Sequence, residues 1–96
     1  MRVSWDERKN QANIRKHGFD FAAAWEIFGL PMLTEIDTRE VIEQRLVGIG
    51  FLRQHIVVVI FVEYEDGILR IISLRKALKH ERERFEEFIK NELGAD

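Results

Sequence analysis

The sequence contains no cysteine, one proline and six glycines. Without cysteine the chain has no disulfide framework, and a zinc site built from thiolates is excluded. The N-terminal sequence MRVSWD includes no apolar stretch of the length that a signal peptide needs. The longest apolar run, Ile56–Val62, is too short to span a bilayer. We therefore expect a soluble, cytoplasmic protein that does not bind a membrane.

Nearly half of the 96 residues are hydrophobic (46%), and a third are charged (33%). This length suits one domain spanning residues 1–96, and the hydrophobic content supplies a core, which argues against disorder. The formal net charge of −2 argues against a dedicated nucleic-acid-binding domain. However, residues 8–17 and 70–84 each carry a local charge of +4 with histidine neutral. We expect these two basic segments to fold onto one face as a phosphate-binding surface, for which an acidic segment of a partner protein would compete.

Helix signals stand near both ends of the chain. Asp6 is suited to cap the start of a helix, and Gly18 suits the left-handed position that closes one. A second helix is predicted from an apolar face at i, i+3, i+4 and i+7, formed by Phe21, Ala24, Trp25 and Phe28. A charged helix is expected from Lys76 to about Leu93. Its apolar stripe consists of Leu78, Phe85, Phe88 and Ile89.

Between these helices the hydrophobic period changes to that of strands. Strands are expected over residues 32–36, 45–51, 56–62 and 69–74, with a further short one possible at 1–5. Residues 37–40 and 53–54 are expected turns, and Asp66-Gly67 is a strong hairpin signal. Residues 56–62 are apolar on both faces, which places this strand centrally. The fold class is therefore α+β: an antiparallel sheet of about four strands with N-terminal helices and a C-terminal helix, all on one side.

Few kinds of catalytic site fit the residues available. His17, His55 and His80 are far apart in the sequence, so no metal-ligand spacing occurs, and we expect no metal or other cofactor. The sequence has no glycine-rich phosphate loop, and Ser73 has no evident base. Basic residues, carboxylates and imidazoles are sufficient for one reaction, in which RNA is cleaved by its own 2′-hydroxyl. That reaction needs a base, an acid and cations for the charge that develops on the phosphate.

Three motifs, in order along residues 5 to about 85, resemble those of BrnT-type toxins. The first comprises Trp5-Asp6, Lys9, Asn13, Lys16-His17-Gly18, Phe21, Ala24 and Phe28. The second comprises Asp37, Arg39, Glu43, Arg45 and Ile49-Gly50. The third comprises Arg70-Ile71-Ile72-Ser73, Arg75, Ala77 and Glu81-Arg82. Each motif is modest alone, but three in this order are specific.

The resemblance implies a RelE-like fold and an endoribonuclease toxin of a type II toxin–antitoxin pair that inhibits translation. It also implies neutralisation by a BrnA-like antitoxin with a ribbon-helix-helix domain, so that DNA is bound only indirectly, through that partner. The candidate catalytic residues are His17, Glu43, Arg45 and Arg75. The candidates for binding RNA phosphates are Lys9, Lys16, Arg70 and Arg82.

Structural interpretations of the same residues stay open. Arg15, Lys16 and His17 also suit a helix C-terminus, where cations stabilise free carbonyls and the helix dipole. Glu43 and Arg45 would share one strand face, either as an ion pair or as a base beside an arginine. Residues 81–84 are also typical of a solvated helix face with ion pairs between successive turns.

The sequence departs from the family pattern at three places, one of which is a hydrophobic strand lengthened around residues 60–63. Phe85 stands where the family often has tyrosine, and Phe51-Leu52-Arg53 replaces a polar turn rich in serine and glycine. The alternative function is therefore a catalytically weak or inert antitoxin-binding module that acts as a co-repressor. Phe85 and the acidic net charge favour this alternative, whereas the Lys-His-Gly motif and Arg75 favour the enzyme.

Overall fold

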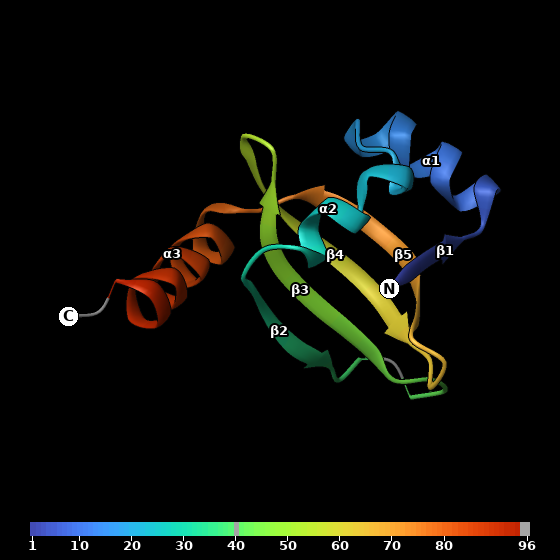
Figure 1. Ribbon diagram of the computed structural model, residues 1–96. Coiled ribbons are helices and arrows are strands. Elements are labelled where there is room, and N and C mark those ends of the chain that lie inside the picture. Colours follow the sequence, from blue (N-terminus) through green and yellow to red (C-terminus); the bar gives the residue numbers. More distant parts are fainter. Residues whose placement is uncertain (40, 95–96) are drawn as a thin grey trace.

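The computed structural model describes residues 1–39 and 41–94, which form a five-stranded sheet flanked by helices (Figure 1). The strands are β1 (Arg2–Trp5), β2 (Met32–Asp37), β3 (Arg45–Leu52), β4 (His55–Glu63) and β5 (Ile68–Lys76). The helices are α1 (Glu7–His17), the 3₁₀ helix η1 (Phe21–Ala23), α2 (Trp25–Phe28) and α3 (Lys79–Leu93). Of the expected turn at 37–40, Glu40 lies outside the described residues. No described helix has the length and apolar character needed to cross a membrane.

The strand order is β1-β5-β4-β3-β2, which confirms the α+β class and the central place of residues 56–62. The four strands β2 to β5 pair in an antiparallel manner. The expectation of about four antiparallel strands is corrected by β1, which adds a fifth strand parallel to β5, with Arg2 beside Ile68 and Trp5 beside Ile71. A β-bulge shifts the β4–β5 register between Ile60 and Phe61.

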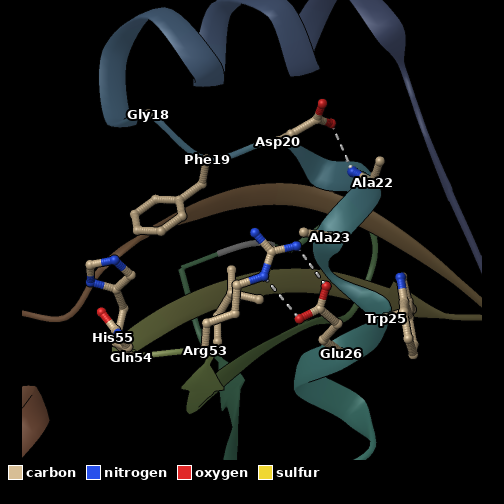
Figure 2. A pocket seen from close by; sticks show the side chains of 11 residues that line it. Gly18, Phe19, Asp20, Ala22, Ala23, Trp25, Glu26, Arg53, Gln54 and His55 are labelled. Carbon is tan, nitrogen blue, oxygen red and sulfur yellow. Dashed lines mark hydrogen bonds and ion pairs between the residues drawn. The ribbon is translucent and has the colours of Figure 1, made fainter.

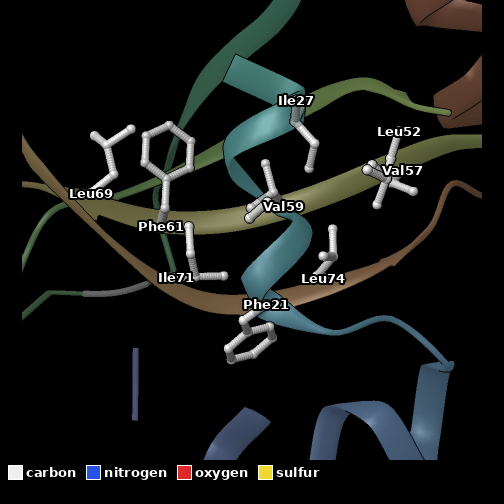
Figure 3. Packing of buried hydrophobic residues seen from close by; sticks show 10 residues of the cluster. Phe21, Ile27, Leu52, Val57, Val59, Phe61, Leu69, Ile71 and Leu74 are labelled. Carbon is white, nitrogen blue, oxygen red and sulfur yellow. The ribbon is translucent and has the colours of Figure 1, made fainter. Parts of the chain in front are cut away.

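The first core lies between one face of the sheet and the N-terminal helices. Because side chains alternate along a strand, Val57, Val59 and Phe61 of β4 all reach this face. They pack with Phe21 of η1 and Ile27 of α2, which are both completely buried (Figure 3). A Cβ atom at Gly50 would come within 2.9 Å of the Ile27 side chain, so the glycine permits α2 to lie directly on β3. The close approach explains why a strand tolerates this residue.

The expected amphipathic helix at 21–28 is broken into a 3₁₀ turn followed by one short α-helical turn. Trp25 is 57% exposed, so its assignment to the apolar face is wrong, and Ile27 is buried in its place. The physical reason is the change of winding, because a 3₁₀ helix has three residues per turn and rotates the residues that follow.

The second core lies on the opposite face of the sheet, beneath α3. Phe85 is completely buried there, packed with Val58, Ile49 and Phe51. The expectation that all helices lie on one side is therefore wrong, and Figure 1 shows α3 well apart from α1 and α2. The helix begins at Lys79 rather than Lys76, because Lys76 still pairs with Val57 in the sheet.

Candidate active site

Helix α1 is attached to the edge of β5 through a single amide side chain. Strand β1 pairs only with Ile68–Ile71, so the second half of β5 has an open edge. At this edge Asn13 Nδ2 donates a hydrogen bond to the Leu74 carbonyl (2.8 Å), and the Leu74 N–H donates to Asn13 Oδ1 (3.2 Å). Asn13 is 8% exposed, and its amide takes the place of a neighbouring strand. The end of α1 is thereby fixed beside the end of β5.

His17 lies one helical turn beyond Asn13, in the last turn of α1. Its side chain is half-buried, and the pKa of His17 is lowered first by this burial and then by the charges of Lys16 and Arg75. Gly18 closes the helix in the left-handed conformation, with φ of 80°, and its N–H donates to the Ile14 carbonyl. The basic triplet is therefore a helix terminus, and it also places His17 within the electrostatic reach of Arg75.

Arg75, at the end of β5, is held by Glu81 from the first turn of α3. Both terminal nitrogens of Arg75 donate to the Glu81 carboxylate at 2.8 Å, and Nη1 also donates to the Lys76 carbonyl. Glu81 in turn accepts a hydrogen bond from the Leu78 N–H, which caps α3. Within the described chain, these bonds leave the Nε edge of Arg75 open to a further acceptor. Arginine meets phosphate oxygens through such an edge.

The ion pair between Arg75 and Glu81 shifts the pKa of both side chains. Arg75 lowers the pKa of Glu81 from 4.5 to about 2, although partial burial opposes the shift. Glu81 in turn raises the pKa of Arg75, while burial and the charge of Arg39 act against it. Arg39 is anchored by Asp37, whose carboxylate accepts from its Nε at 3.0 Å. We name Lys16, His17, Arg75 and Glu81 the Arg75 cluster.

A second group, the Arg70 cluster, consists of Glu43, Arg45 and Arg70. Arg70 Nη2 donates to Glu43 Oε1 at 2.6 Å, and Arg45 Nε lies 3.7 Å from the same oxygen. Arg70 stands opposite Val62 across the β4–β5 ladder, and Arg45 is the first residue of β3 on the other side of Val62. Glu43 precedes β3, so the expected strand face shared by Glu43 and Arg45 does not form. The two residues are nevertheless close enough for an ion pair.

The arginines of both clusters lie on the sheet face that carries α3, whereas Lys16 and His17 approach Arg75 from the end of α1, beside the open edge of β5. Val58 is opposite Arg75 and Val62 is opposite Arg70, so the clusters are separated by four residues of β4, about 13 Å. Between them the face is formed by Ser73, Ile60 and Val47, which are half-buried.

Two expected phosphate ligands stand outside both clusters. Lys9 is exposed on α1, eight residues and thus about 12 Å of helix before His17. Arg82 is exposed on α3, next to Glu81 but on another side of the helix. The sequence interpretation did not name Glu81 as a site residue. Glu81 belongs to the third motif, and that membership was the only signal in the sequence.

Comparison with known proteins shows the family to which this chain belongs. The family model for the ribonuclease toxin, BrnT, of type II toxin–antitoxin systems matches residues 5–81. The chain belongs to the BrnT family. The crystal structure of the Brucella abortus ribonuclease toxin, BrnT, is similar to it, with a TM-score of 0.64 and 36% identity, covering 82% of this chain and 99% of that one. No curated protein matches the chain.

Membership in the BrnT family confirms the resemblance drawn from the three motifs. The chain is accordingly a ribonuclease toxin of a type II toxin–antitoxin system, with an RNA substrate and an antitoxin partner. In the described part of this BrnT-family chain, no three histidine or carboxylate side chains gather as a possible metal site. The groups that the geometry does bring together are an imidazole, a lysine and an arginine fork, which are suited to proton transfer and phosphate binding.

Proposed function

We propose that this toxin is a metal-independent endoribonuclease, acting in the cytoplasm, that cleaves RNA by attack of its 2′-hydroxyl on the adjacent phosphate. The observation that carries this proposal is the position of His17, whose pKa is lowered by burial and by the charges of Lys16 and Arg75. A lowered pKa keeps the imidazole neutral near pH 7, as a general base requires.

In this mechanism His17 takes the proton from the 2′-hydroxyl as the 2′-oxygen forms a bond to phosphorus. The bond from phosphorus to the 5′-oxygen breaks, and the leaving oxygen takes a proton from an acid or from water. The products are a 2′,3′-cyclic phosphate and a free 5′-hydroxyl. Arg75 binds the phosphate through its open Nε edge and stabilises the negative charge of the transition state, together with Lys16. The Arg70 cluster binds a phosphate farther along the strand.

A test of these roles compares His17→Ala and Arg75→Ala with the matched control Arg15→Ala, which removes an exposed charge two residues before His17. We expect cleavage to fall on the order of 10²–10⁴-fold without the base. Loss of the arginine should cost on the order of 10²–10³-fold. The melting temperature of His17→Ala and the control should stay near that of the wild type. Full activity of both active-site variants would exclude this site.

The proposed partner is a BrnA-like antitoxin with a ribbon-helix-helix domain, through which the toxin contacts DNA indirectly. One observation favours the rival function, an inert co-repressor module: Arg70 and Arg75 are already paired with Glu43 and Glu81. Phe85 is completely buried in the second core, where its ring packs beside Val58 and serves the core rather than the surface. Induction of the toxin without its antitoxin separates the two functions, since only the enzyme should arrest growth and degrade RNA.

A further inference from the structure

A cleft of about 680 Å³ lies on the side of the molecule away from α3, and the proposed mechanism does not use it (Figure 2). It is bounded by the segment after α1, by α2 and by the turn between β3 and β4. Its volume falls in the range of small-ligand sites. The cleft begins at Gly18, whose Cα is about 3.8 Å from that of His17. The cleft therefore begins next to His17, the member of the Arg75 cluster that α1 contributes.

Arg53 lines the cleft, and its backbone conformation is unusual. It has φ of 57°, the only positive φ among the described residues other than glycine. A side chain in this conformation costs roughly 1–2 kcal/mol, and such positions usually carry glycine. The strained residue is the first of the two-residue turn between β3 and β4, and it lines the cleft.

The guanidinium of Arg53, whose side chain is 69% exposed, is oriented by a bidentate ion pair. Its Nε and Nη2 donate to the two carboxylate oxygens of Glu26 at 3.2 and 3.0 Å. Figure 2 shows this pair within the cleft, with the rings of Phe19 and His55 beyond it. Those two rings are in edge-to-face contact, with centroids 5.5 Å apart. Guanidinium planes held in this way are surfaces on which nucleobases stack.

Trp25 adds an aromatic surface at the other end of the cleft. It lies on α2 next to Glu26, and 57% of it is exposed, although an indole buries a large apolar area when it is covered. The acidic side chains Asp20 and Glu26 offset the charge of Arg53 in the cleft. The cleft therefore carries no excess positive charge and suits an uncharged heterocycle better than a phosphate.

We propose that this cleft is a nucleobase subsite, in which a base of the RNA strand stacks on Arg53 and Trp25 while a neighbouring phosphate lies at the Arg75 cluster. The inference rests on the proposed function for its substrate and adds a source of sequence preference. A concave site beside His17 fits a single base better than a protein surface, because protein partners contact larger and flatter areas.

The test uses a labelled 2′-O-methyl RNA oligonucleotide, which lacks the attacking hydroxyl and therefore binds without being cleaved. Trp25→Ala and Arg53→Gly should each weaken binding by roughly 5–150-fold, the loss that corresponds to one stacked base. Arg53→Gly should melt at or above the wild-type temperature, because glycine relieves the left-handed strain. Arg53→Lys keeps the positive charge but should also bind the RNA oligonucleotide less tightly, because lysine lacks the planar guanidinium group. Arg2→Ala is the control, since it removes an exposed arginine that lies outside the cleft and outside both basic segments.

Salt dependence distinguishes a base contact from a phosphate contact. The slope of the logarithm of the RNA-binding constant against the logarithm of salt concentration should stay unchanged in Trp25→Ala and Arg53→Gly. Arg75→Ala should reduce this slope by the amount that corresponds to about one phosphate contact. Preference among homopolymers should flatten only in the cleft variants. Because binding is measured without cleavage, an inactive wild type would refute the proposed function and leave this result standing.

Three outcomes would overturn the subsite. The first is wild-type affinity for RNA in both Trp25→Ala and Arg53→Gly. The second is a loss confined to antitoxin binding, which would make the cleft a protein contact. The third is equal affinity for a free nucleoside monophosphate and for the oligonucleotide, which would assign the cleft to a free nucleotide.

Discussion

Carboxylates of the same chain hold the arginines of both clusters in place. Glu81 binds Arg75 and Glu43 binds Arg70, each within hydrogen-bonding distance. Such a carboxylate fixes the direction of the fork and removes rotamer freedom that phosphate binding would otherwise have to remove. The carboxylates also reduce the local positive charge while no RNA is bound.

We predict that Glu81→Gln lowers both activity and stability. Arg75 would lose its fixed direction, and the cleavage rate should fall on the order of 10–10²-fold. The folded-state pKa of Glu81 is lowered to about 2, so its stabilising effect is complete above about pH 4.5 and is lost as pH falls toward 2. Urea unfolding at pH 7, 4.5 and 3 should show a loss of at most about 3 kcal/mol at pH 7. The loss should shrink at pH 3.

Glu83→Gln is the matched control, because Glu83 is exposed two residues further along α3. It should change neither the rate nor the pH dependence of unfolding beyond a few tenths of a kcal/mol. Equal effects of Glu81→Gln and Glu83→Gln would show that the Arg75–Glu81 pair has no special role.

A second prediction at this scale concerns the pH dependence of cleavage. Because the pKa of His17 is lowered from 6.5, the acid limb of kcat/KM should have its midpoint below pH 6.5. The rate should increase as the imidazole loses its proton and should be constant through pH 7. His17→Ala should remove this limb, as measured with a short RNA substrate. A midpoint above 6.5 would contradict the assignment of His17 as base.

At the scale of elements, the decisive contact is the one between α1 and the open edge of β5. Asn13 satisfies both backbone groups of Leu74, and the same helix then carries His17 to Arg75. The sheet thus positions the proposed base through an amide and not through a loop.

Asn13→Ala should therefore destabilise the protein and uncouple the proposed base from the phosphate site. Two buried backbone groups would lose their partner, at about 1–3 kcal/mol each. Chemical denaturation measures this loss, and cleavage should remain impaired at temperatures where the variant is still folded. Asn91→Ala, at an exposed position of α3, should be neutral. Unchanged activity in a folded Asn13→Ala protein would show that α1 is held by other contacts.

The elements show which features a sequence can predict. Asp6 and Gly18 act as predicted because caps depend on neighbouring residues only. The strands at 45–52 and 55–63 follow from alternation and from β-branched residues. The pairing of β1 with β5 could not be predicted from the sequence, because no local pattern encodes a contact between segments that lie so far apart in the chain. Glu81 resembles its exposed neighbours in sequence, and only the turn from β5 into α3 directs it at Arg75.

At the scale of the whole molecule, the absence of a metal-ligand spacing in the sequence carries a prediction of its own. RNA cleavage should proceed at the same rate in EDTA, because protein side chains supply both the charge and the proton transfer. The fragments should carry 2′,3′-cyclic or 3′-phosphate ends, which end-labelling can detect. Loss of cleavage in EDTA that a divalent cation restores would contradict the mechanism.

The parallel pairing of β1 with β5 also determines when the toxin can become active during its synthesis. Arg2 cannot pair in the sheet until Ile68 has been synthesised. His17 cannot approach Arg75 and its partner Glu81 until both of these later residues have been synthesised. Contacts between distant parts of a chain form late, and the N-terminal part leaves the ribosome first. Any product that ends before Arg75 lacks half of the proposed site. We therefore expect that a product which ends before Arg75 does not cleave RNA, and that a growing chain stays inactive until Arg75 and Glu81 have been synthesised.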